Sequence, residues 1–194
     1  MILSLQGCMA VGKTTAINYL KEYDYINISY EKNDHVVKEI KEKGLNKNVL
    51  EDYIKIQTLW LENEITRYTK AKEYDCSIMD FGIEEIIFHT LTYPITIGMN
   101  WDIENMMKDI LDKARSYMPD RILFLDASDE TLRKRKEGDP TRSRSSFDTY
   151  LNKFMPLKRE FFSKLNNVDY LNVDNLTKEE VAIKVKEWVD SCIK

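Results

Sequence analysis

Short apolar segments alternate along the chain with longer segments in which apolar residues recur every three or four positions. The short segments are typical of buried strands, and they cover residues 2–5, 25–29, 76–80, 121–126 and 168–173. The periodic segments predict helices over residues 13–23, 48–72, 83–91 and 102–117. Strands that alternate with helices predict an α/β fold, in which right-handed crossovers build a parallel sheet covered on both faces.

The end of the chain and its length complete this picture. Thr177 and Glu180 have the spacing of a capping box, so we expect a last helix to begin there. A chain of 194 residues has the size of one domain, and we expect a single domain over residues 1–194. Hydrophobic residues make up 43% and charged residues 32%, which provides a core and excludes a disordered chain.

Charge and cysteine content narrow the class of protein. The net charge of -4 argues against a protein that binds a nucleic acid polymer through its backbone phosphates. The three cysteines are widely spaced and form no CxxC pair, which is typical of reduced thiols in the cytoplasm. No apolar run approaches the roughly 18 residues of a membrane-spanning helix. We therefore expect a cytoplasmic protein with no membrane and no nucleic acid partner.

The strongest motif follows the first predicted strand. Residues 7–14, GCMAVGKT, match the phosphate-loop pattern G-x-x-x-x-G-K-[ST], whose backbone N–H groups surround phosphate oxygens. The next helix adds its positive N-terminal end, Lys13 is expected to reach the β- and γ-phosphates, and Thr14 to bind Mg²⁺. The motif predicts ATP and Mg²⁺ as cofactors, with the nucleotide bound by Gly7, Ala10, Val11, Gly12, Lys13, Thr14 and Thr15.

The rest of the sequence indicates which kind of phosphate-loop protein this is. It contains no N/T-K-x-D guanine motif and no LSGGQ-type signature, and it is small, which favours a small-molecule kinase. In the order of its elements the chain resembles the P-loop nucleoside and nucleotide kinases, most of all the deoxynucleoside kinases. The resemblance covers nearly the whole chain and is carried by GCMAVGKTT, Glu31, Gln57, Asp80, LDAS at 125–128 and an arginine-rich segment.

This resemblance has structural and chemical implications. It implies a five-stranded parallel sheet in the order 2-3-1-4-5, and transfer of the ATP γ-phosphate with Mg²⁺. The chain departs from the pattern after the third strand, where deoxynucleoside kinases have Glu-Arg-Ser and thymidylate kinases Asp-Arg. Here the sequence is Asp80-Phe81-Gly82, without the arginine.

Two acidic positions follow from the chemistry of phosphoryl transfer. A carboxylate must hold the metal near Thr14, and both Asp80 and Asp126 end an apolar strand. The kinase topology places the third strand beside the first and favours Asp80, while Asp126 also fits a helix cap. Glu31, after the second strand, corresponds to the carboxylate that accepts the substrate proton in deoxynucleoside kinases; Asp34 is the competing candidate.

The arginine-rich segment predicts a lid over about 133–146. Its arginines flank the turn Gly138-Asp139-Pro140, and closure over ATP would bring guanidinium groups to the transferring phosphate. A solvated basic surface is the competing interpretation, and Arg133 fits it best. The residues expected to contact the transferring phosphate are Arg135, Arg142 and Arg144.

Gln57 is the main candidate for acceptor recognition. It lies on the apolar stripe of the helix predicted over 48–72, and a buried amide needs hydrogen-bond partners. A nucleobase edge is one such partner and the protein backbone is another. Tyr53 and Trp60 flank Gln57 and could stack on a base, and Arg67 could anchor the substrate or only extend to solvent. His35 and His89 are expected to be structural.

Together these observations predict a kinase that transfers the ATP γ-phosphate to a nucleoside- or nucleotide-like small-molecule acceptor. A kinase for another alcohol, such as an antibiotic or a sugar-like metabolite, is the first alternative. A nucleotide-binding switch without phosphotransferase activity is the second, and the arginine-rich segment favours the enzyme. The sequence is compatible with a homodimer.

Overall fold

The fold is known from a computed structural model, which describes residues 1–138 and 146–193. Its sheet has five parallel strands in the order β2-β3-β1-β4-β5, which confirms the expected order 2-3-1-4-5. The strands are β1 (Ile2–Gly7), β2 (Asn27–Ser29), β3 (Ser77–Asp80), β4 (Arg121–Asp126) and β5 (Val168–Asn172).

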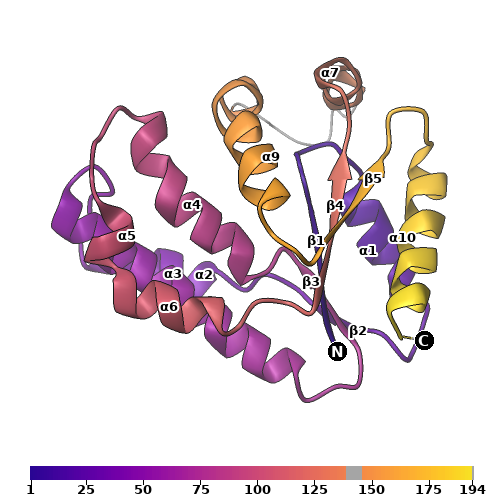
Figure 1. The fold of residues 1–194 in the computed structure, drawn as a ribbon, viewed down its shortest axis with the longest axis horizontal. Helices are drawn as coiled ribbons and strands as arrows, with labels where there is room; N and C mark the ends of the chain where they lie inside the picture. The colour runs from indigo at the N-terminus through magenta and orange to yellow at the C-terminus, as the bar shows by residue number, and fades with distance from the viewer. Residues whose placement is uncertain (139–145, 194) are drawn as a thin grey trace.

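Helices cover both faces of the sheet, as the alternating pattern predicts. In Figure 1, α1 and α10 lie on one face, α3, α4 and α6 lie on the other, and α7 and α9 lie toward the carboxyl ends of the strands. No helix of the described ranges is long and apolar enough to cross a membrane. The helices are α1 (Lys13–Leu20), α2 (Asp34–Glu42), α3 (Leu50–Ala71), α4 (Ile83–Thr96), α5 (Ile103–Met106), α6 (Lys108–Arg115), α7 (Asp129–Glu137), α8 (Phe147–Thr149), the π-helix η1 (Tyr150–Phe154), α9 (Met155–Ser163) and α10 (Lys178–Ile193).

Several boundaries differ from the sequence prediction. The helix expected over 102–117 is two helices, α5 and α6, because Met107 leaves the helical conformation at φ -113° and ψ 20°. The capping box is present: the Thr177 N–H donates to Glu180 Oε2 at 2.8 Å, and the Glu180 N–H donates to Thr177 Oγ1 at 3.1 Å. Three helical stretches, α2, α7 and the run from α8 to α9, lie outside the predicted ranges.

Strand β1 occupies the centre of the sheet and is buried along its whole length. Leu3 and Leu5 pack into the core formed with α1 and α10, whereas Ile2 packs against α3. A central parallel strand is covered on both sides, which is why apolar residues predominate in it and why even its polar residues, Ser4 and Gln6, are buried.

The register of the sheet determines where the site lies. Leu5 of β1 is opposite Asp80 of β3, and Gly7 is opposite Leu125 of β4. The carboxyl ends of these three strands therefore meet at one edge, and open α/β sheets bind their ligands at this edge.

Candidate active site

The phosphate loop has the backbone conformation that its glycines allow. Gly7 and Gly12 have φ values of +137° and +112°, and Ala10 also has a positive φ of 65°. A Cβ atom at Gly7 would lie 2.4 Å from the Leu125 carbonyl oxygen, so no larger residue fits between β1 and β4. The loop ends where α1 begins at Lys13, with Thr14 and Thr15 in the first turn.

Lys13 folds back over its own loop. Its Nζ donates to the Gly7 carbonyl at 3.2 Å and to the Cys8 carbonyl at 3.1 Å, and lies 4.3 Å from the centre of the Phe81 ring. Burial, and then the positive charge of Lys158, lower the pKa of Lys13 to about 8. The ammonium is thus held at the place where the motif expects phosphate oxygens.

The two candidate metal-binding carboxylates have different surroundings. Asp126 is occupied, because Arg159 donates to its Oδ1 from Nε at 3.1 Å and from Nη2 at 3.0 Å. Asp80 ends β3 beside β1, as expected, and no hydrogen bond or ion pair of its carboxylate is found within the described part of the chain. The Asp80 carboxylate and the Thr14 hydroxyl offer the oxygen ligands that Mg²⁺ prefers. The geometry therefore favours Asp80 over Asp126.

The segment Asp80-Phe81-Gly82 is strained, and its neighbours explain the sequence. Phe81 has a φ of +56°, an uncommon value for a bulky residue. A Cβ atom at Gly82 would lie 2.4 Å from Glu84 Oε2, so glycine leaves room for this buried carboxyl. Burial raises the pKa of Glu84, whose Oε1 accepts from Gln6 Nε2 of β1 at 2.7 Å.

Arg67 stabilises this segment from α3. Its Nη2 donates to the Phe81 carbonyl at 2.6 Å, and its Nη1 to the carbonyls of Ser29 at 2.8 Å and Asp80 at 3.4 Å. Nε and Nη2 also bond the Glu64 carboxylate. All the N–H groups of a guanidinium are thus directed to protein acceptors. Arg67 was expected to anchor the substrate or to extend to solvent; instead it is buried and ties together the ends of β2 and β3.

Glu31 lies just beyond β2, on the same edge as the phosphate loop. Although the side chain reaches solvent, the protein packed around its carboxyl raises the pKa to about 7. The charge of Arg67 opposes this increase, while Glu64, Asp80 and Glu85 add to it. A carboxyl with this pKa is suited to accept a proton near neutral pH.

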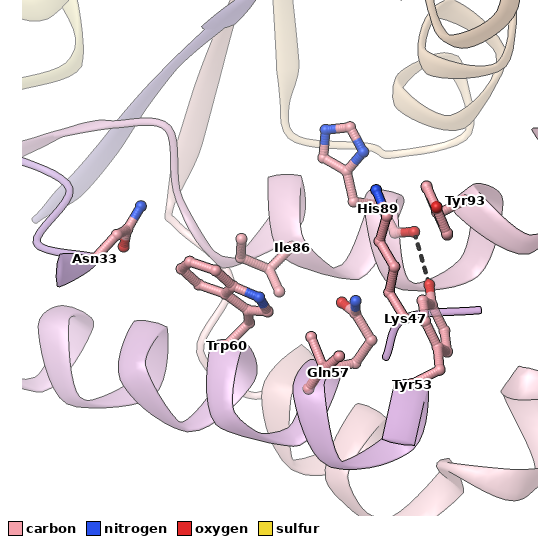
Figure 2. Close-up of a pocket in the computed structure, with 9 residues that line it drawn as sticks. Asn33, Lys47, Tyr53, Gln57, Trp60, Ile86, His89 and Tyr93 are labelled. Carbon is pink, nitrogen blue, oxygen red and sulfur yellow. Dashed lines mark hydrogen bonds between the residues drawn. The ribbon is translucent and has the colours of Figure 1, made fainter. Parts of the chain in front are cut away.

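A pocket of about 340 Å³ lies between α3 and α4 (Figure 2). It brings together three of the residues expected to bind the acceptor, Tyr53, Gln57 and Trp60. Asn33, two residues after Glu31, lies at one end of it in Figure 2. The remaining lining residues are Lys47, Ile56, Ile86, His89 and Tyr93. Aromatic walls with a few polar groups suit a flat, polar-edged ligand.

Hydrogen bonds between α3 and α4 orient the polar groups of this pocket. Thr90 Oγ1 donates to Gln57 Oε1 at 2.9 Å, which fixes the plane of the amide. Tyr53 is fully buried; its hydroxyl donates to the Thr90 carbonyl at 2.8 Å, and its ring stacks on Tyr93 with centroids 5.9 Å apart. Tyr53 therefore forms part of the wall of the pocket, and Gln57 presents an oriented amide to it.

The predicted lid lies only partly within the described residues. On α7, the Arg135 guanidinium donates to the carbonyls of Val11 at 3.3 Å and Val173 at 2.6 Å, so it joins this helix to the phosphate loop. Arg133 pairs with Asp148 on the surface, in agreement with its expected minor role. Arg142 and Arg144 lie in 139–145, outside the described residues.

Sequence reasoning missed a group of buried charges behind the phosphate loop. Lys158 of α9 and Glu85 of α4 form an ion pair with Nζ and Oε2 2.6 Å apart, and His89 Nε2 is 3.2 Å from Glu85 Oε1. The only sequence signal was the spacing of four between Glu85 and His89, which places them on one helix face. Nothing in the sequence connects Lys158 with them.

Comparison with known proteins shows which solved structures share this fold. No known family profile matches the sequence, and no curated protein sequence matches it significantly. Among solved structures, thymidylate kinase from Candida albicans superposes with a TM-score of 0.66 at 19% identity, covering 98% of this chain and 91% of that one. Deoxyadenosine kinase from M. mycoides, solved with bound dATP, superposes with a TM-score of 0.68 at 16% identity, covering 96% and 97%. The chain thus has the fold of the P-loop nucleoside and nucleotide kinases, which confirms the resemblance at the level of the fold.

Proposed function

We propose that this protein is a kinase that transfers the γ-phosphate of ATP to a hydroxyl group of a nucleoside-like small molecule. The observation that carries the proposal is the placement of two sites. The phosphate loop and the aromatic pocket that contains the Gln57 amide lie beside the same edge of the sheet. In the sequence, Glu31 comes after the loop and before the residues that line the pocket. Two solved structures that share the fold are a nucleoside kinase and a nucleotide kinase, which supports this reaction.

Each residue has a defined part in this proposal. The phosphate loop binds ATP through its N–H groups and Lys13, while Thr14 and Asp80 hold Mg²⁺, which neutralises charge on the transferring phosphate. Glu31 accepts the proton of the acceptor hydroxyl. Arg135 holds α7 against the loop and, with Arg142 and Arg144, belongs to the segment that closes over the nucleotide.

The charges near the acceptor favour a hydroxyl over a phosphate as the group that is phosphorylated. Thymidylate kinases carry an arginine directly after the aspartate that ends the third strand, whereas this chain has Phe81 there. All the donors of Arg67 bond other groups of the protein. Lys158 is paired with Glu85. Glu31, when ionised, would repel the dianion of a monophosphate.

The test is an ATP-consumption screen with Mg²⁺ across nucleosides, their monophosphates and sugar-like alcohols. We expect nucleosides to accelerate consumption well above the rate without acceptor, and Lys13→Ala to abolish it. Stimulation by another alcohol alone would redefine the acceptor. Binding of Mg·ATP without stimulation by any acceptor would indicate a switch protein, and the absence of Mg·ATP binding in calorimetry would overturn the proposal.

The cysteines support a cytoplasmic location, which is also part of the proposal. Cys8 and Cys76 are buried free thiols, and Cys192 is a partly exposed one. Burial raises the pKa of each thiol, which lowers the fraction present as the reactive thiolate. Free thiols persist in a reducing compartment.

A further inference from the structure

Lys158 is a fully buried charged residue beside the phosphate loop, and no motif accounts for it. Its Nζ lies 3.4 Å from the Gly7 carbonyl oxygen, to which it donates, and 3.3 Å from the Tyr150 hydroxyl. Lysine is almost never completely buried unless it is paired, because removing its charge from water is costly. Such a position requires an explanation in terms of what the ammonium contacts.

The Gly7 carbonyl is shared by two lysines. Lys13 Nζ donates to it at 3.2 Å, so both ammonium groups converge on the first residue of the loop. Both also lie near one aromatic ring: the Phe81 centroid is 4.3 Å from Lys13 Nζ and 5.0 Å from Lys158 Nζ. The strained Phe81 side chain therefore packs against two cations, an arrangement that cation–π attraction stabilises.

Glu85 holds the Lys158 ammonium in place. The two charged atoms are 2.6 Å apart, and the contact is electrostatic rather than a well-angled hydrogen bond. Burial alone would raise the pKa of Glu85, but Lys158 and His89 hold it at about 2, so the Glu85 carboxylate stays ionised at neutral pH. Because His89 lines the acceptor pocket, the contacts run from that pocket through Glu85 and Lys158 to Gly7.

We propose that Lys158 is a second lysine of the nucleotide site, a positioning residue that keeps the Gly7 carbonyl turned away from the phosphates when Lys13 leaves this carbonyl for a bound nucleotide. With Lys13 engaged elsewhere, the carbonyl would otherwise be an unpaired buried acceptor, and the loop could rotate it toward the phosphates. Lys158 approaches from α9, which lies beside α4 near the carboxyl ends of the strands (Figure 1). The inference rests on the proposed function, because it requires Mg·ATP binding at this loop.

The experiment separates this role from that of a structural ion pair. Lys158→Met alone leaves Glu85 as an uncompensated buried charge and is expected to destabilise the fold. The double variant Lys158→Met with Glu85→Gln removes both charges and keeps an acceptor for His89. Its melting temperature is expected to recover, while its Kd for Mg·ATP in calorimetry stays raised by about tenfold, the loss of one charge-assisted hydrogen bond.

Lys186 provides a matched control. Its Nζ forms an ion pair of 2.6 Å with Asp190 and lies 4.2 Å from the Tyr23 ring, on α10. Lys186→Met therefore removes a similar set of contacts that does not reach Gly7, and its Kd for Mg·ATP should equal that of the wild type. A double variant that folds and binds Mg·ATP as the wild type does would overturn the inference. Failure of the wild type to bind Mg·ATP would instead overturn the proposed function.

A measurement on the wild type covers the case in which the double variant does not fold. In protein labelled with ¹⁵N-lysine, the buried Lys158 ammonium is expected to give a slowly exchanging signal. Addition of Mg·ATP should shift this signal as Lys13 leaves Gly7, while the Lys186 signal stays in place. A Lys158 signal that does not respond to saturating Mg·ATP would contradict the positioning role.

Discussion

Glu31 shows how a single carboxyl acquires a property suited to catalysis. Its free-solution pKa lies well below neutrality, and in the folded chain the surrounding protein and the carboxylates of Glu64, Asp80 and Glu85 raise it to about 7 against the opposing charge of Arg67. The proton is therefore bound more tightly in the folded protein than in the unfolded chain. Deprotonated Glu31, the form able to accept a proton, predominates only above about pH 7.

This gives a prediction for the pH dependence of activity. We expect kcat/KM of the wild type to fall as the pH decreases through about 7, because protonated Glu31 cannot act as the base. Glu31→Gln should lower kcat by about 10²–10⁴-fold and remove this acidic limb. Steady-state rates measured from pH 5.5 to 8.5 are the test.

Asp34 is the control for this experiment, since it is the other acid considered for the role. It is exposed and opens α2. Asp34→Asn should keep both kcat and the acidic limb. If the limb persists in Glu31→Gln and disappears in Asp34→Asn, the base is Asp34.

At the scale of elements, the ends of two strands that flank β1 compete for the metal. β3 and β4 both pair with β1 and both end in aspartate. The helices packed behind them distinguish the two aspartates. α9 supplies Arg159 to the carboxylate of Asp126, whereas α3 supplies Arg67 to the backbone of Asp80, whose carboxylate bonds no group in residues 1–138 and 146–193. Both strands have the same sequence pattern, an apolar run that ends in aspartate, so the contacts of the packed helices distinguish Asp80 from Asp126.

Asp80→Asn should therefore impair Mg²⁺-dependent turnover more than Asp126→Asn. Loss of a negative ligand weakens Mg²⁺ binding, so a titration of activity should show a higher half-saturating concentration for Asp80→Asn. Asp126→Asn should mainly disturb the ion pair with Arg159, which is about one-third exposed on each side (31% and 35%) and contributes little to stability. The opposite ranking in the titration would assign the metal to Asp126.

The pair of helices α3 and α4 makes the acceptor pocket, and Gln57 links them through Thr90. Gln57→Leu should raise the KM for the phosphate-accepting substrate roughly 5- to 150-fold, which corresponds to about 1–3 kcal/mol, because this substrate loses its hydrogen bond to the amide. ATP binding should stay intact. The change also leaves the buried Thr90 hydroxyl without its acceptor. Gln57→Leu with Thr90→Val removes this side effect and should melt close to the wild type.

Two measurements on these variants distinguish recognition from structure. The melting temperature reports the link between α3 and α4, and the separate KM values for acceptor and ATP report the site. A double variant with restored stability and a raised acceptor KM supports recognition by Gln57. Equal changes in both KM values that disappear when stability is restored would show that the amide is only structural.

At the scale of the molecule, the strand order assembles the site from distant parts of the chain. Because β1 lies between β3 and β4, residues near positions 7, 80 and 126 meet at one edge, and β2 brings Glu31 to the same edge. α1 and α10 support the loop from one face, where Val181 approaches Gly12, while α3 and α4 build the pocket on the other. The phosphate loop and the pocket are thus placed on opposite sides of a shared edge.

The local sequence was sufficient to predict much of this. The phosphate loop is a contiguous segment whose conformation depends on its own glycines, and strands buried on both faces have an unmistakable apolar run. The strand order came with the resemblance to the kinases. Tyr53, Gln57 and Trp60 were found because they share one helix and its period brings them to one side.

Only the tertiary structure decided which of the polar groups are free to act. Arg67 reads in the sequence as an available cation, yet its donors are used by the Glu64 carboxylate and by backbone carbonyls at the ends of β2 and β3. Lys158 is far from the phosphate loop in the chain and belongs to a helix that the periodicity did not predict, yet its ammonium lies at Gly7. Pairing and burial depend on contacts between residues far apart in the chain, 151 positions for Lys158 and Gly7, and no local pattern encodes such contacts.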